Sequence, residues 1–289
     1  MDLMLTLSAQ AKVNLALDVT AKRSDGYHEI DSVMQSIALA DQITLEPHNR
    51  IELTSNDNRL PADGQNLAWK AAELMQREAG TAIGVKIHIT KNIPIAAGLA
   101  GGSADAAAVL LGLNQLWNLN LGNDELMRLG VKLGADVPFC IGKGTARARG
   151  IGEKLTGIKS RINCSLLLVT PNIQVSTAQA YNRLQLDQIK QRPRINRVIA
   201  ALEEGNLPLL TESWGNVFEE FILKDFPAVA QVKEAFRRFG LSACLMSGSG
   251  PSVYALNPPP EAVKPFSASI PPDWFCCFTH FYLGEDKRD

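Results

Sequence analysis

The fold of this 289-residue chain is decided by one stretch, Pro94-Ile95-Ala96-Ala97-Gly98-Leu99-Ala100-Gly101-Gly102-Ser103-Ala104-Asp105. A strand-like alternation over residues 85–90 precedes it and an alanine-rich run from residue 106 follows, so a glycine-rich turn opens a helix. Glycine lets neighbouring backbone N–H groups converge on one point, and a helix start adds unpaired N–H groups and a positive dipole end. The context favours a phosphate site over the alternative, a turn that merely joins a strand to a helix.

The bulk composition is that of an ordinary globular protein. Hydrophobic residues make up 46% and charged residues 20%, and 29 Lys and Arg nearly balance 30 Asp and Glu, which gives a formal charge of −1. No global basic field draws the chain to nucleic acid, and only a local patch stays open. The length predicts about two domains.

Cysteines, histidines and the N-terminus exclude several classes. The five cysteines lie mostly in apolar runs without C-x-x-C spacing, which indicates reduced core residues. The four histidines lack the spacing of a structural zinc site. We see neither a targeting pattern nor an apolar run of membrane-spanning length. We therefore expect a cytoplasmic protein, or a stromal one of plastid type whose targeting peptide has been removed.

Periodicity predicts mixed strands and helices, in an α+β or α/β arrangement. In the first half we expect strands over residues 5–17, 42–45, 51–54 and 85–90 and helices over residues 66–78, 103–117 and 123–133. In the second half we expect helices over residues 196–204, 214–223 and 228–239 and strands over residues 243–246, 252–256 and 274–282. A boundary near residue 160 predicts domains at 1–160, binding ATP or phosphate, and 161–289.

Two polar residues interrupt the first apolar alternation, Ala11-Lys12-Val13-Asn14-Leu15. On a strand, Lys12 and Asn14 share one face. A solvated face is the ordinary explanation. A phosphate-binding chain also needs a cation, which makes Lys12 a candidate.

Three further stretches carry polar groups that could act on a ligand. Aromatic rings follow an Asp-Gly turn in Arg23-Ser24-Asp25-Gly26-Tyr27-His28-Glu29, and taken alone they favour packing over base stacking. One carboxylate stands in Gly134-Ala135-Asp136-Val137-Pro138-Phe139-Cys140, between a helix end and an apolar stretch that we expect to be a strand. A helix dipole is unfavourable to an anion there, so Asp136 either caps a turn or pairs with Lys12 to act on a hydroxyl. A second glycine-rich turn occurs in Met246-Ser247-Gly248-Ser249-Gly250-Pro251-Ser252.

Other phosphate motifs are missing. The chain has no G-x-x-x-x-G-K-[ST] and no G-x-G-x-x-G, which excludes a P-loop, a dinucleotide fingerprint and a protein-kinase loop.

These motifs together resemble the GHMP kinases, named after galactokinase, homoserine kinase, mevalonate kinase and phosphomevalonate kinase. Residues 94–106 resemble the family's phosphate motif, and Ala11-Lys12-Val13-Asn14 and Ser247-Gly248-Ser249-Gly250-Pro251 are similar to its first and third motifs. The resemblance spans nearly the whole chain. The loop departs from the family at Ala100, where Gly is frequent, and at Ala104, where Ser is common.

The family's fold implies two α+β domains, the N-terminal one with a left-handed βαβ unit and the C-terminal one a ferredoxin-like α/β sandwich, with ATP and substrate in the cleft between them. The turn at residues 25–28 and the stretch at residues 134–139 resemble the members that act on a cytidine diphosphate-linked methylerythritol in the non-mevalonate isoprenoid pathway. ATP would then phosphorylate the C2 hydroxyl, with Mg²⁺ near the Ser103 hydroxyl. Further metal ligands are not assigned.

The resemblance also implies roles for single residues. Asp136 would be the catalytic base, or would only orient the hydroxyl, and Lys12 would hold Asp136 and stabilise developing charge. The ATP-binding residues would be Pro94, Ala96, Ala97, Gly98, Leu99, Ala100, Gly101, Gly102, Ser103 and Ala104, with Asn66 and Lys91 near adenosine by position alone. The substrate-binding residues would be Asn14, Tyr27, His28, Tyr181, Gly248 and Ser249. Tyr181 lacks a diagnostic motif around it, and a core position is its alternative.

Three other functions stay open: another small-molecule kinase of the mevalonate or homoserine type, a non-catalytic nucleotide-binding protein, and a nucleic-acid-binding module of related fold. We expect a small-molecule substrate, no nucleic acid or membrane partner, and a monomer or weak homodimer.

Overall fold

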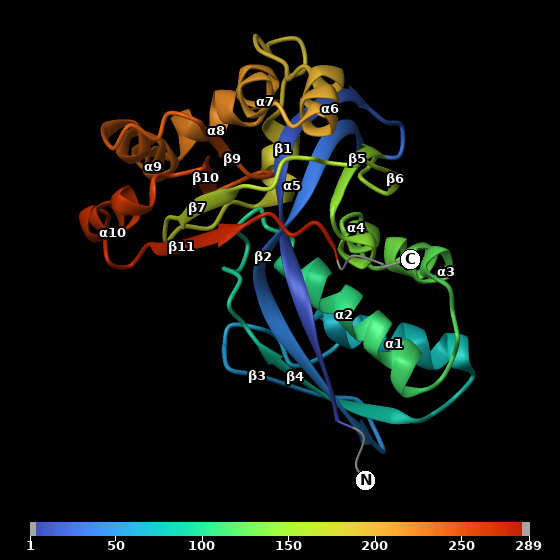
Figure 1. The fold of residues 1–289 in the computed structure, drawn as a ribbon. Coiled ribbons are helices and arrows are strands. Elements are labelled where there is room, and N and C mark those ends of the chain that lie inside the picture. The colour runs from blue at the N-terminus through green and yellow to red at the C-terminus, as the bar shows by residue number, and fades with distance from the viewer. Residues whose placement is uncertain (1–3, 285–289) are drawn as a thin grey trace. The chain divides into compact units, whose positions relative to one another are not determined.

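The computed structural model describes residues 4–284, whose backbone falls into two compact units (Figure 1). Within the described residues, unit 1 comprises residues 4–11, Leu39–Ile95 and Ala100–Lys143, and unit 2 comprises Lys12–Ala38, Ala96–Leu99 and residues 144–284. The long strands β1 (Leu5–Lys22) and β2 (His28–His48) contribute to both units. The expected domains at 1–160 and 161–289 stay a prediction.

Unit 1 combines a small sheet with four helices. The end of β2 pairs antiparallel with β4 (Gly84–Thr90), and β4 pairs parallel with β3 (Glu52–Ser55). The helices are α1 (Leu67–Ala79), α2 (Gly101–Leu116), α3 (Asn123–Val131) and α4 (Val137–Gly142). Because α1 joins the parallel strands β3 and β4, the three elements form a βαβ unit.

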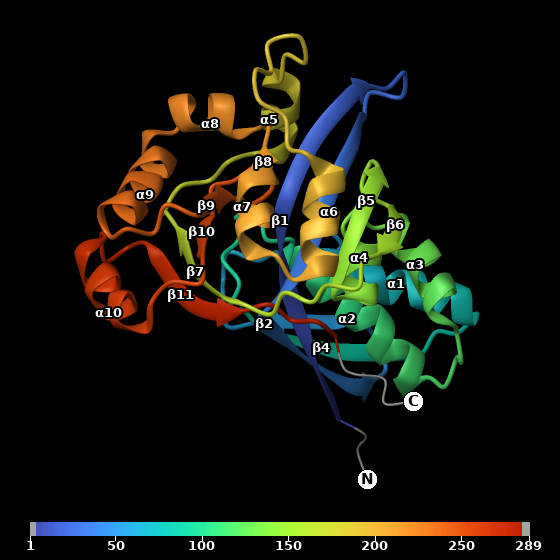
Figure 2. The same ribbon diagram turned by 45° about the horizontal axis from the view of Figure 1, so that its top comes forward.

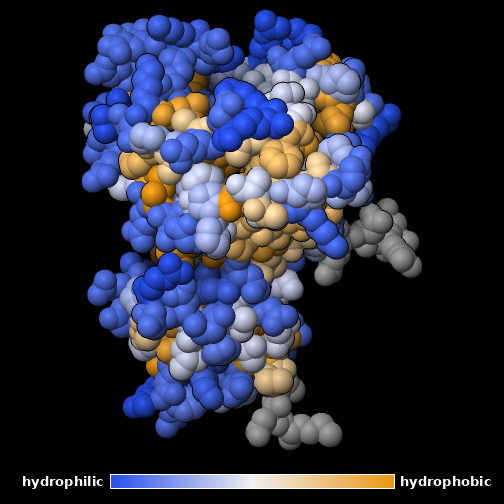
Figure 3. Space-filling model, turned by 90° about the vertical axis from the view of Figure 1, so that its left-hand side faces the viewer, coloured by the Kyte–Doolittle hydropathy of each residue, from blue (hydrophilic) through white to orange (hydrophobic). Residues whose placement is uncertain are grey.

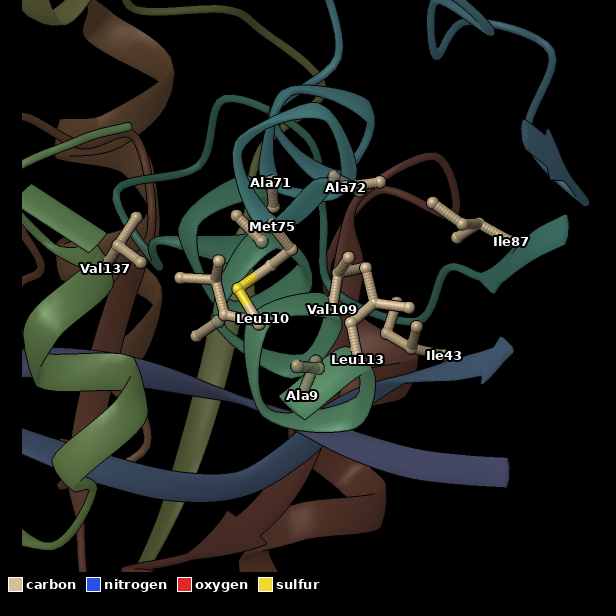
Figure 4. Close-up of a cluster of buried hydrophobic side chains, with 14 of the residues drawn as sticks. Ala9, Ile43, Ala71, Ala72, Met75, Ile87, Val109, Leu110, Leu113 and Val137 are labelled. Carbon is tan, nitrogen blue, oxygen red and sulfur yellow. The ribbon is translucent and has the colours of Figure 1, made fainter. Parts of the chain in front are cut away.

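The core of unit 1 lies between the helices and the sheet. Figure 4 shows Val109, Leu110 and Leu113 of α2 among side chains from α1 and from the strands, including Met75 and Ile87. The alanines that follow the phosphate loop are almost fully buried, and their small side chains let α2 lie close to its neighbours. At Gly112 a Cβ atom would lie 2.4 Å from Leu45 Cδ1 and 2.8 Å from Leu7 Cδ1, so this glycine marks a close approach of α2 to the strands.

Unit 2 contains its own antiparallel sheet of four strands in the order β11-β7-β10-β9 (Figure 2). The strands are β7 (Ser165–Thr170), β9 (Cys244–Met246), β10 (Val253–Leu256) and β11 (Phe275–His280). Helices α9 (Pro227–Arg238) and α10 (Pro260–Ser269) occupy the crossover connections, and the rings of Phe236 and Phe266 stack at 4.7 Å between them. This strand order, with helices in the crossovers, confirms the expected ferredoxin-like arrangement.

Two further strands of unit 2 pair with the long strands. The start of β2 pairs antiparallel with β5 (Thr145–Gly150), which pairs with β6 (Lys154–Gly157). The two-residue strand β8 (Gly215–Asn216) pairs parallel with β1. The other helices are α5 (Thr177–Arg183), α6 (Ile195–Glu204), α7 (Leu207–Ser213) and α8 (Glu219–Asp225).

The structure corrects two expected elements. The helix expected over residues 214–223 is wrong in its first part, since residues 215–216 form β8 and helix α8 begins only at Glu219. Pairing with β1 determines this segment, and a helical period in the sequence cannot reveal it. The strand expected after Asp136 is also wrong, because residues 137–142 form the helix α4 with Pro138 in its first turn, where proline is well tolerated.

Figure 3 shows one face of the molecule, on which hydrophilic residues predominate and apolar residues form smaller patches. Within residues 4–284, none of the helices has the length and apolar character needed to cross a membrane.

We expect Gly112→Val to lower the free energy of unfolding by about 1–3 kcal/mol, because the added methyl groups overpack the contact with Leu45 and Leu7. Urea denaturation followed by circular dichroism measures the change. Gly157→Val is the control, since no atom lies within 4 Å of a Cβ at Gly157. Equal midpoint shifts for both variants would contradict the close approach.

Candidate active site

The phosphate loop adopts a backbone path that alternates into the left-handed region. Ala96, Gly98 and Ala100 have φ angles of 53°, 74° and 57°. Ala100 is the N-cap of α2, so the helix begins at Gly101, two residues earlier than expected. The first N–H groups of α2, from Gly101 to Ser103, have no acceptor within the helix and are free to bind an anion.

The carbonyl of Gly98 joins the three predicted motifs within unit 2. It accepts hydrogen bonds from Lys12 Nζ at 3.2 Å and from Ser247 Oγ at 2.9 Å. The backbone is tied as well, since Lys12 N donates to Leu99 O at 3.1 Å. A Cβ at Gly98 would lie 2.2 Å from Ser247 O, so both the φ angle and the space require glycine here.

Lys12 and Asn14 share one face of β1 as expected, but that face is buried. Lys12 is 4% exposed, which excludes the alternative of a solvated lysine. Its Nζ donates to Asn14 Oδ1 at 2.7 Å, and Asn14 Nδ2 donates to Ser32 Oγ at 2.9 Å. Ser32 Oγ donates to Ala16 O at 2.6 Å, which completes a chain of hydrogen bonds that orients the ammonium. Sequence reasoning missed Ser32, because only the pairing of β1 and β2 brings it beside Asn14.

Asp136 lies at the N-cap of α4 in unit 1. The expectation of an unfavourable helix dipole is therefore wrong, because α3 ends at Val131 and Asp136 begins a new helix, whose N-terminal end favours a carboxylate. The Ser103 hydroxyl lies beside this turn, 3.8 Å from the position of a Cβ at Gly134. Within unit 1, the Ser103 hydroxyl of α2 thus lies beside the turn that leads to Asp136, the candidate base.

Aromatic side chains gather at another part of unit 2. The rings of His28 and Tyr181 lie 5.2 Å apart, and Tyr181 packs edge-on against Phe218 at 4.9 Å. Burial lowers the pKa of His28 from its ordinary value, and the charge of Lys22 acts in the same direction. The imidazole is therefore held in its neutral form at neutral pH. Tyr27 is 60% exposed at the turn before His28.

The two residues expected near adenosine have partners within unit 1. Asn66 caps α1, since its Oδ1 accepts from Ala68 N at 2.9 Å and its Nδ2 donates to Pro61 O at 2.9 Å. Lys91 Nζ donates to Asp105 Oδ2 at 2.9 Å and to Asp41 Oδ2. The ammonium of Lys91 is thus already paired with two carboxylates.

This buried cluster of Asp41, Lys91 and Asp105 was not foreseen as a unit. Asp41 also accepts from Asn92 N at 2.6 Å and Ile93 N at 2.8 Å, so it holds the backbone just before the phosphate loop. Burial, which Lys91 only partly offsets, raises the pKa of Asp105 to about 7. Its Oδ1 is buried and has no hydrogen-bond partner within residues 4–284. Asp105 is the last residue of the glycine-rich stretch at residues 94–105. The sequence signal that could have revealed its burial is a carboxylate among alanines.

Two family models match the chain: "GHMP kinases N terminal domain" over residues 66–144 and "GHMP kinases C terminal" over residues 198–271. The chain belongs to the GHMP kinase family. The resemblance to this family is thereby confirmed, and so is its α+β fold.

Two relatives of the same name show which members of the GHMP kinase family this chain is similar to. The 4-diphosphocytidyl-2-C-methyl-D-erythritol kinase of Geobacillus sp. (strain WCH70) is 49% identical over 254 residues, which cover 87% of this chain and 88% of that protein. The protein of the same name from Bacillus licheniformis is 48% identical over 250 residues, 86% of each chain.

Two solved structures match the chain over nearly its whole length. A crystal structure of 4-(cytidine 5'-diphospho)-2C-methyl-D-erythritol kinase matches this GHMP kinase with a TM-score of 0.82 and 32% identity, over 97% of this chain and 100% of that one. A homoserine kinase from Cytophaga hutchinsonii matches over 97% and 95% of the two chains, with a TM-score of 0.76 and 20% identity, and shares the fold.

Asp105→Asn tests the buried carboxylate by pH. Because the pKa of Asp105 is raised to about 7 from 3.8, the proton that it holds in the folded state stabilises the fold at low pH, and this contribution is lost as the pH rises through 7. Asparagine removes this dependence. We therefore expect the melting temperature of the variant, relative to the natural chain, to rise between pH 5 and pH 8.

Asp57→Asn is the control, because Arg59 lowers the pKa of Asp57 to about 2 and Asp57 stays ionised throughout that range. The difference in melting temperature between Asp57→Asn and the natural chain should be constant from pH 5 to pH 8. A constant difference for Asp105→Asn as well would show that Asp105 does not titrate there.

Proposed function

We propose that this protein is an ATP-dependent kinase that phosphorylates the C2 hydroxyl of 4-diphosphocytidyl-2-C-methyl-D-erythritol, a step of the non-mevalonate isoprenoid pathway. The observation that carries the proposal is the carbonyl of Gly98, which accepts hydrogen bonds from both Lys12 and Ser247. One atom of the phosphate loop is thus held by the other two motifs of a kinase family. The names of the relatives supply the substrate.

The nucleotide side of the proposal rests on the loop at residues 94–104. The N–H groups at the start of α2 would bind the ATP phosphates by backbone contact, because Ala100 and Ala104 offer no hydroxyl. Asn66 and Lys91 would lie near adenosine. The ammonium of Lys91 is already paired with Asp41 and Asp105, which together use two of its three N–H donors.

In the transfer step, the substrate hydroxyl oxygen forms a bond to the γ-phosphorus while the bond from that phosphorus to the β,γ-bridging oxygen breaks, and ADP leaves. Asp136, at the N-cap of α4, would accept the hydroxyl proton or orient the hydroxyl. Lys12 would stabilise the charge that develops on the phosphoryl oxygens.

Mg²⁺ fits this set of donors. Within residues 4–284, His, Cys, Asp and Glu side chains form no group of three that could hold a metal ion by themselves. Mg²⁺ does not need such a cage, since it commonly binds one or two protein side chains together with substrate phosphates and water. The Ser103 hydroxyl beside the Gly134 turn would be one ligand, and the ion would neutralise phosphate charge.

The cytidine end would bind at the aromatic residues of unit 2. The neutral imidazole of His28 and the ring of Tyr181 are suited to stacking on a base, and Tyr27 is exposed beside them. Asn14, Gly248 and Ser249 would contribute polar contacts. A small-molecule substrate and the absence of a membrane-crossing helix within residues 4–284 fit a cytoplasmic enzyme.

ADP release on adding candidate substrates tests the function. With ATP and Mg²⁺, we expect turnover with the cytidyl-linked methylerythritol and at least about 100-fold lower kcat/KM with mevalonate or homoserine, because only the first occupies the aromatic residues. Faster turnover of mevalonate or homoserine would overturn the substrate but keep the kinase. ATP binding without ADP release for every substrate would indicate a non-catalytic nucleotide-binding protein.

Asp136→Asn and Lys12→Met test the catalytic roles. We expect each to lower kcat by roughly 10²- to 10⁴-fold, because the carboxylate and the ammonium act mainly in the transfer step. The dissociation constant of ATP, measured by calorimetry, should change less than about 5-fold in Asp136→Asn. A melting curve for each variant confirms that it is folded, which matters for Lys12 because its side chain is buried. Unchanged kcat in both folded variants contradicts the roles.

A further inference from the structure

Asn216 is a buried residue of unit 2 to which the motifs assign no role, and it is 6% exposed. It lies on β8, whose register places Leu17 opposite Asn216, and Val217 N donates to Leu17 O at 3.0 Å. The neighbouring strand β1 is the one that carries Lys12 and Asn14. The backbone of Asn216 is therefore fixed to the strand of the candidate catalytic lysine.

The side-chain amide of Asn216 reaches the second glycine-rich turn. Its Nδ2 donates to Met246 O at 2.8 Å and to Gly248 O at 2.8 Å, and its Oδ1 accepts from Phe218 N at 3.0 Å. Both hydrogens of the amide nitrogen are thus used. The two carbonyls lie on either side of Ser247, so one side chain fixes the backbone that carries the Ser247 hydroxyl.

These contacts close a ring of interactions. Ser247 Oγ donates to Gly98 O at 2.9 Å, and Lys12 Nζ donates to the same carbonyl at 3.2 Å. Lys12 belongs to β1, which pairs with β8 and so leads back to Asn216. These contacts link Asn216 through Ser247 to the carbonyl of Gly98, which Lys12 also binds.

Glu219 holds the same turn from the other side. Its Oε1 accepts from Met246 N at 2.9 Å and from Lys233 Nζ at 2.6 Å. The N–H and the carbonyl of Met246 are thus both bound by side chains from the segment at residues 216–219. Such complete satisfaction of a buried backbone unit specifies one position for the turn.

We propose that Asn216 is a positioning residue of the phosphoryl-transfer reaction, which acts by fixing Ser247 and thereby the Gly98 carbonyl and Lys12 Nζ. The expected effect on kcat rests on the proposed function. The expected effect on the position of the turn rests on the geometry alone. The surroundings of residue 216 require asparagine, because its side chain must donate two hydrogen bonds to carbonyls and accept one from a backbone N–H. Aspartate has the same shape but turns two hydrogen bonds to carbonyls into repulsions.

The kinetic test compares Asn216→Asp and Asn216→Ala with Asn206→Ala. Asn206 caps α7 in the same unit by accepting from Leu209 N at 3.0 Å, so its loss costs stability without touching the ring. At a temperature where all variants are folded, we expect both Asn216 variants to lower kcat roughly 10- to 100-fold, with a smaller change in KM for the phosphate acceptor. Asn206→Ala should keep kcat within about 2-fold.

A double-mutant cycle with Ser247→Ala asks whether Asn216 acts through Ser247. We expect Asn216→Ala to lower kcat much less in the Ser247→Ala background than in the natural chain, because residues that act as a unit are not additive. Full additivity overturns the proposed route. An Asn216 variant that is folded and retains the natural kcat overturns the inference itself.

Amide hydrogen exchange gives a readout that does not depend on turnover. We expect Asn216→Asp to speed exchange roughly ten-fold at Gly250, Ser252 and Lys12, whose N–H groups donate to Ser247 O, Ala97 O and Leu99 O. Asn206→Ala should leave these amides unchanged. If the natural chain shows no kinase activity, the proposed function fails, but the exchange experiment still tests the ring of contacts. Unchanged exchange in Asn216→Asp would contradict the ring.

Discussion

The carbonyl oxygen of Gly98 is the atom on which the candidate site of unit 2 depends. A carbonyl has two lone pairs, and here Lys12 Nζ and Ser247 Oγ both donate to it, so the sharing sets the angle between two side chains from distant parts of the sequence. Because the ammonium is charged and buried, its hydrogen bonds are stronger than those of a neutral donor. A residue with a Cβ at Gly98 would push Ser247 away and separate the pair.

A different kind of restraint acts on the part of the loop that belongs to unit 1. Lys91 is paired with Asp41 and Asp105, and Asp41 also accepts two backbone N–H groups just before the loop. Such a buried charge cluster contributes little net stability, because desolvation offsets most of the attraction, but it strongly disfavours any arrangement that breaks a pair. It therefore specifies where α2 begins relative to β2 and β4, which is what a backbone phosphate site requires.

The sequence was sufficient for the parts of the site that are local. The strand before the loop, the alanine-rich helix after it and the shared face of Lys12 and Asn14 follow from periods of two and 3.6 residues, which short segments carry by themselves. Asp136 was placed wrongly at a helix end before a strand, because Pro138 was not recognised as a first-turn residue. Ser32, Asp41 and Asn216 could not be predicted, since each acquires its partner through pairing of segments that lie far apart in the chain.

The two alanines of the loop show what these restraints accomplish together. Ala96 and Ala100 both have φ angles in the left-handed region, where a residue with a Cβ is disfavoured by about 1–2 kcal/mol. Such strain persists only where the surroundings over-determine the backbone. Between these alanines, Ala97 O and Leu99 O accept backbone hydrogen bonds from Ser252 and Lys12, and the carbonyl of Gly98 is held by two side chains. Because three consecutive carbonyls are fixed, the flanking residues have no relaxed path to follow, and the loop keeps its shape without the additional glycine that is frequent at residue 100.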